Sequence, residues 1–88
     1  MTILPMTVRR RWRVTDLAAC PPRTHDVTRT QLVAWLEERL AGLDLARAGD
    51  LEVWWVLLDA LDHLDHHRDG WASVTLAHVG IVLAEVVR

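Results

Sequence analysis

The sequence lacks lysine, phenylalanine, tyrosine and asparagine, and it has one cysteine, Cys20. All ten of its basic residues are therefore arginine. The missing residue types have AT-rich codons, so their absence indicates a GC-rich gene of bacterial or phage origin rather than selection for guanidinium chemistry. A single cysteine excludes an internal disulfide framework and fits a reducing compartment. We therefore expect a cytoplasmic protein.

Motifs for catalysis and for metal binding are also missing. The chain has no G-x-S-x-G, no glycine-rich phosphate loop, no C-x-x-C and no H-E-x-x-H. Neither Cys20 nor any serine stands beside a credible general base. We expect no enzymatic activity and no cofactor.

Targeting and membrane segments are not apparent either. The basic run near the start has no apolar stretch behind it, unlike a signal peptide. The longest apolar stretch, residues 71–87, is short for a membrane span and is interrupted by His78 and Glu85. We therefore expect no membrane partner.

Charge is distributed unevenly along the 88 residues. Residues 1–25 carry five arginines and one acid, a net charge of +4, whereas residues 26–88 carry five arginines and eleven acids, a net charge of −6. Half of all residues are apolar, which excludes a disordered chain. We divide this single small domain into an extended basic arm with a proline-containing linker, residues 1–25, and a helical domain, residues 26–88.

Helical periodicity dominates the second part. Residues 50–67 place apolar side chains on about half of a helical wheel. Residues 28–42 begin with a capping-box pair, Thr28 and Gln31. Arg39 falls within the apolar arc of that helix, so it either extends outward to water or pairs with an acid on a neighbouring helix. Residues 71–87 are ambiguous, but we favour a helix over a hairpin turning at Gly80.

The N-terminal part alternates between apolar and basic side chains over residues 7–15, a pattern typical of a strand. Because we identify no second convincing strand outside the ambiguous C-terminal segment, we expect this one to pair with its symmetry mate in a dimer or with a partner's sheet edge. Residues 16–25 are interpreted as a linker. The predicted fold is thus mainly all-α, a three-helix bundle preceded by an extended basic N-terminal arm or short strand.

Three helices of this kind carry more apolar surface than so short a chain can bury by itself. We therefore predict a small protein–protein interaction module, such as an adaptor, an inhibitor or a regulatory subunit, acting as a homodimer or within a complex. A large aromatic ring or a small-residue stripe suits such contacts. The candidate partner-binding residues are Trp12, Trp55, Trp71, Gly80 and Ala84.

Two other functions have weaker signals. Clustered arginines with an interleaved tryptophan could bind nucleic acid, although the overall charge is negative. The residues of that alternative are Arg9, Arg10, Arg11 and Arg13. His63 and His67 have the spacing of a helical metal-chelating pair, but we favour a solvated polar helix side as their explanation and expect no metal site.

Overall fold

The computed structural model describes residues 11–86, which form three strands and three helices. Half of these residues are helical and 24% lie in strands, so the fold is mixed α/β and the predicted all-α three-helix bundle is wrong. The elements in chain order are β1 (Arg11–Asp16), β2 (Arg23–Thr28), α1 (Arg29–Ala41), α2 (Asp50–Asp65), α3 (Asp69–Ala77) and β3 (Ile81–Val86).

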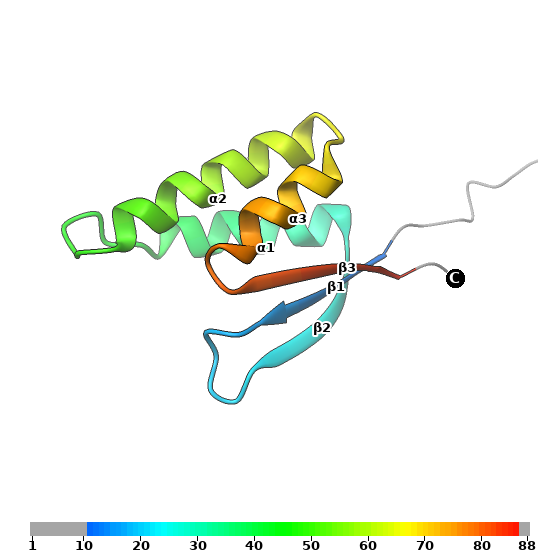
Figure 1. Cartoon of the computed structure of the whole chain (residues 1–88), viewed down its shortest axis with the longest axis horizontal. Coiled ribbons are helices and arrows are strands. Elements are labelled where there is room, and N and C mark those ends of the chain that lie inside the picture. Colours follow the sequence, from blue (N-terminus) through cyan, green and yellow to red (C-terminus); the bar gives the residue numbers. More distant parts are fainter. Residues whose placement is uncertain (1–10, 87–88) are drawn as a thin grey trace, which may run out of the picture.

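The strands form an antiparallel sheet in the order β2-β1-β3, and all three helices lie on one side of it (Figure 1). In the central strand, Val14 pairs with His25 of β2 and with Leu83 of β3. Because side chains alternate along a strand, Trp12 and Val14 point toward the helices and are buried. The opposite side of the sheet, which we call the open face, carries no helix of the described chain.

One hydrophobic core joins the sheet to the helices. Each element except β2 contributes at least two of its side chains, and β2 contributes Val27. The buried apolar residues are Trp12, Val14, Val27, Leu32, Leu36, Leu57, Ala60, Leu64, Ala72, Leu76, Ile81 and Leu83.

Local capping signals fix the start of α1 as predicted. The Thr28 hydroxyl accepts the backbone N–H of Gln31 at 3.3 Å, and the Gln31 side chain accepts the backbone N–H of Thr28 at 2.9 Å. One residue further, Arg29 donates to the carbonyl of Leu64 and pairs with Asp69. The start of α1 is thereby joined to the end of α2 and the start of α3.

The C-terminal segment corrects the predicted helix over residues 71–87. Helix α3 ends at Ala77, Gly80 adopts a left-handed backbone with φ of 78°, and β3 follows. The carbonyl of Gly80 accepts the backbone N–H of Leu17 at 2.8 Å, which brings the chain alongside β1. A β-branched segment is favoured in such a strand, where it buries one side and exposes the other. The small residues at 80 and 84 therefore form no helical stripe.

The N-terminal strand also lies in a different setting from the one predicted. Its described part, β1, is the centre of the chain's own sheet, so it needs no partner's edge. The residues interpreted as a linker form the end of β1, the turn of a β1–β2 hairpin and the first part of β2. β2 was not predicted from the sequence because it is largely polar, with Val27 its only core residue. Residues 7–10 of the predicted strand lie outside the described residues.

Candidate functional site

Polar contacts join the facing sides of α2 and α3. The Thr75 hydroxyl donates to Asp59 Oδ2 at 3.4 Å, and His63 Nε2 lies 3.3 Å from the same oxygen. The Nε–H of Arg68 donates to His63 Nδ1 at 3.0 Å, so the proton of a neutral His63 ring lies on Nε2, toward Asp59. These contacts hold one side of α2 directly against α3.

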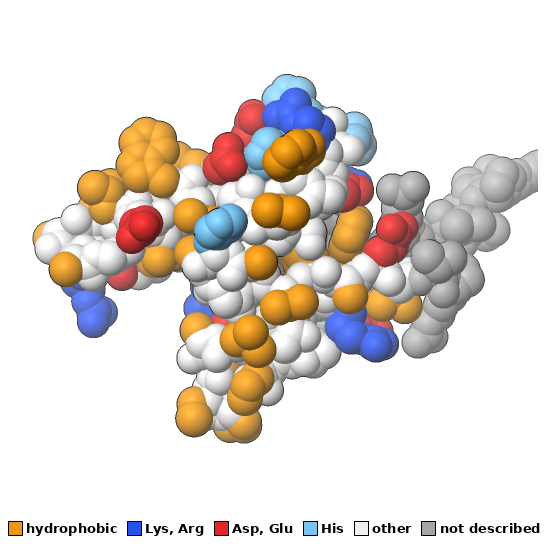
Figure 2. All heavy atoms as spheres, viewed as in Figure 1, with side chains coloured by type: hydrophobic (Ala, Val, Ile, Leu, Met, Phe, Trp, Pro, Cys, Tyr) orange, Lys and Arg blue, Asp and Glu red, His pale blue; other side chains and the backbone are white. Residues whose placement is uncertain are grey.

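Large apolar side chains are exposed along this side of the two helices. Trp55 precedes Asp59 by one helical turn, and Leu51 precedes Trp55 by another, so all three share one side of α2. Trp71 and Val74 lie on the adjoining surface of α3. Leu51, Trp55, Trp71 and Val74, which we call the aromatic face, are 49%, 61%, 63% and 56% exposed. Figure 2 shows hydrophobic side chains at the surface of these helices with histidine and acidic side chains among them.

Both exposed indole rings are held by a neighbouring ring. Trp55 makes an edge-to-face contact with Trp54, with centroids 5.0 Å apart and planes at 76°. Trp71 stacks on His63, with centroids 6.4 Å apart and planes at 27°. Rings that are already oriented lose little side-chain entropy on binding, which suits them to anchor a partner.

Acidic side chains surround the aromatic face. The side chains of Asp59 and Asp62 are 58% and 57% exposed, and Glu52 is exposed one residue after Leu51. Arg68 offsets part of this charge by pairing with Asp62 at 3.1 Å. The surface therefore combines apolar rings with a net negative margin.

The structure separates the predicted partner-binding residues. It exposes Trp55 on α2 and Trp71 on α3, whereas Trp12 is buried in the core with 4% exposure. Gly80 lies in the turn before β3, and Ala84 lies on the open face of the sheet. Sequence reasoning missed Leu51 as an exposed position, because it lies within the predicted apolar arc.

Some of the basic residues of the nucleic-acid alternative lie outside the described part of the chain. Arg9 and Arg10 are outside the described residues, and Arg11 and Arg13 lie on the open face. The Nε–H of Arg13 donates to Asp26 at 3.0 Å. This hydrogen bond and the charge of Asp26 raise the pKa of Arg13 above its ordinary value. One of the two described arginines is thus already paired with an acid.

The two candidate metal ligands do not share one helix side. α2 ends at Asp65, and His67 follows it with a left-handed backbone, φ of 57°. His63 instead contacts Asp59 and Arg68. Within residues 11–86, no three His, Cys, Asp or Glu side chains are arranged to hold a metal ion.

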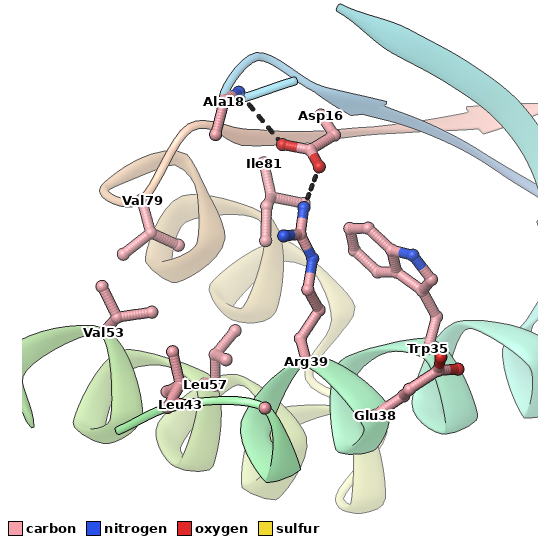
Figure 3. A pocket seen from close by; sticks show the side chains of 11 residues that line it. Asp16, Ala18, Trp35, Glu38, Arg39, Leu43, Val53, Leu57, Val79 and Ile81 are labelled. Carbon is pink, nitrogen blue, oxygen red and sulfur yellow. Dashed lines mark hydrogen bonds and ion pairs between the residues drawn. The ribbon is translucent and has the colours of Figure 1, made fainter. Parts of the chain in front are cut away.

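A cavity of about 430 Å³ lies between the helix layer and one end of the sheet (Figure 3). Arg39 of α1 crosses it to pair with Oδ2 of Asp16 on β1, and Oδ1 of Asp16 accepts the backbone N–H of Ala18 at 3.0 Å. The guanidinium carbon also lies 4.9 Å from the centroid of the Trp35 ring. Pairing with an acid was one of the two alternatives predicted for Arg39, but the acid, Asp16, lies on a strand and not on a neighbouring helix.

No helix among the described residues is both long enough and apolar enough to cross a membrane. Comparison of the chain with protein-family models, with curated proteins and with solved structures found no match.

Proposed function

We propose that this chain is a small protein–protein interaction module that associates with a second copy of itself through the aromatic face. The observation that carries the proposal is the exposure of Trp55 and Trp71, at 61% and 63%, on adjoining sides of α2 and α3. Burying a large apolar side chain contributes roughly 1.5–3 kcal/mol, and tryptophan is enriched among the residues that dominate interfaces. Leu51 and Val74 extend the same apolar surface.

The proposed biological role is that of an adaptor, an inhibitor or a regulatory subunit acting in the cytoplasm. The single cysteine, Cys20, is exposed, which suits a reducing compartment. In such a role the aromatic face supplies the affinity, and its acidic margin opposes the approach of a second copy, so that salt modulates the association.

The test is the mass of the pure protein in solution, measured by sedimentation and by light scattering. We expect the wild type to be dimeric or larger, and the double variant Trp55→Ser/Trp71→Ser to be monomeric with an unchanged circular dichroism spectrum. Leu45→Ser is the matched control, because Leu45 is 50% exposed in the loop between α1 and α2. A wild type that stays monomeric at every concentration would contradict the proposal.

A further inference from the structure

We propose that the cavity beside Arg39 binds a small uncharged molecule with an apolar body and one carbonyl-type hydrogen-bond acceptor. This inference does not depend on the aromatic face, which lies on other residues. It rests on three features of the cavity: its apolar lining, its fixed hydrogen-bond donor and its balance of charge.

The apolar lining comes from several elements. Val53 and Leu57 belong to α2, and Leu43 follows α1. Val79 lies in the turn before β3, and Ile81 is the first residue of β3. Figure 3 shows these side chains around one space. A volume of about 430 Å³ lies within the range of small-molecule sites, which are mostly apolar with a few placed polar groups.

Arg39 supplies the donor. The carboxylate of Asp16 and the ring of Trp35 fix its guanidinium from two sides. In Figure 3 one guanidinium nitrogen points to Asp16, while another points toward the space bordered by Val53 and Val79. A guanidinium has five N–H donors and no acceptor, so the bond to Asp16 leaves donors for a ligand. The ligand must therefore present an acceptor.

The charges favour a neutral acceptor over a carboxylate. Asp16 and Arg39 offset each other, and both carboxylate oxygens of Asp16 already accept a hydrogen bond. Glu38 remains at the rim, where it repels an anion. Arg23 and His25 line an adjoining hollow on the other side of Arg39 and Trp35, and they weaken this repulsion without lining the apolar cavity itself. A ketone, ester or amide oxygen suits this setting best.

Three probes of the same size test the proposal: acetophenone, isopropylbenzene and benzoate each have a phenyl ring and the same number of non-hydrogen atoms. The probes are titrated into the isotope-labelled full chain and followed by NMR. Acetophenone is expected to shift the methyl signals of Leu57, Val79 and Ile81 and the indole N–H signal of Trp35. We expect isopropylbenzene, which lacks the acceptor, and benzoate, which is charged, to bind at least about five-fold more weakly.

Val53→Trp should fill the cavity and abolish these shifts, whereas Val82→Trp, the same change on the open face, should leave them unchanged. If Val53→Trp does not fold, nuclear Overhauser effects between acetophenone and the methyl groups of Leu57 and Val79 in the wild type decide the matter. Shifts confined to Trp55 and Trp71, or equal binding of the three probes, would overturn the proposal. Those shifts would leave the test of self-association unaffected.

Discussion

The carboxylate of Asp16, on the central strand, is paired with the guanidinium of Arg39, on α1, and this pair joins the helix layer to the sheet. The side chain of Asp16 is 10% exposed and that of Arg39 is 40% exposed. The charge of Asp16 therefore relies on the ion pair for its stabilisation more than the charge of Arg39 does. A buried charge that loses its partner is strongly destabilising, whereas an uncharged replacement of both partners is often tolerated.

Replacing Arg39 by leucine should therefore lower the free energy of unfolding by about 3 kcal/mol, since it leaves the carboxylate of Asp16 uncompensated. The double variant Asp16→Asn/Arg39→Gln removes both charges and should recover at least half of that loss. Urea denaturation of the three proteins measures the difference. Equal losses in the single and double variants would show that the pairing itself contributes little.

The parts of the fold predicted correctly are those with strong local signals. The capping box at Thr28 and Gln31 is confirmed, and α1 begins at the next residue. The predicted helix over residues 50–67 corresponds to α2, which ends two residues earlier. Capping and helical periodicity depend on neighbours within a few residues, so sequence alone carries them.

The parts predicted wrongly depend on contacts between distant segments. β2 is polar and becomes a strand because β1 pairs with it. β3 has enough alanine and leucine to suggest a helix, but β1 and the left-handed Gly80 make it a strand. The same holds for the candidate site. Trp55 and Trp71 are predicted as partner-binding residues because their side chains are large, whereas Leu51 lies within the apolar arc of the helical wheel, where burial is expected. Only the packed helices show that it is exposed.

Gly80 should resist substitution more than Gly70. Gly80 has a φ of 78°, and an added Cβ would lie at an ordinary contact distance of 3.7 Å from the Cβ of Leu17. Backbone strain rather than a steric clash therefore determines the loss of stability. We expect Gly80→Ala to lower the free energy of unfolding by about 1–2 kcal/mol. Gly70 lies in α3 with open space around it, so Gly70→Ala should be neutral or stabilising by up to about 1 kcal/mol. Thermal denaturation compares the two, and a similar loss in both would contradict this account.

Thr28→Ala should lower the free energy of unfolding by about 1 kcal/mol, because the first turn of α1 loses its side-chain cap. Thr30→Ala is the control, since Thr30 is exposed in the same turn and is not the capping residue. Hydrogen exchange should show faster opening of the first turn in the Thr28 variant alone. An equal effect of the two variants would mean that threonine content, and not the cap, matters.

Nucleic-acid binding should be limited by the pairing of Arg13 with Asp26 on the open face. We expect the wild type to bind a short DNA duplex no more tightly than proteins that bind DNA non-specifically, with a Kd of about 10⁻⁴ M at physiological salt. Asp26→Asn should strengthen binding by removing a negative charge, and adding Arg13→Gln should reverse the gain. Fluorescence anisotropy measures all three. Tight binding by the wild type would favour the nucleic-acid alternative.

Salt should strengthen self-association through the aromatic face. Two copies bring the acidic margins around Trp55 and Trp71 together, and counterions screen that repulsion within about 10 Å at 0.1 M and 3 Å at 1 M. The apolar contacts are not weakened by such screening. Sedimentation from about 0.05 M to 0.5 M sodium chloride should therefore show a falling dissociation constant, and Asp59→Asn/Asp62→Asn should flatten the dependence. Association that weakens with salt would instead indicate an interface formed by opposite charges, such as the arginines of the open face against these acids.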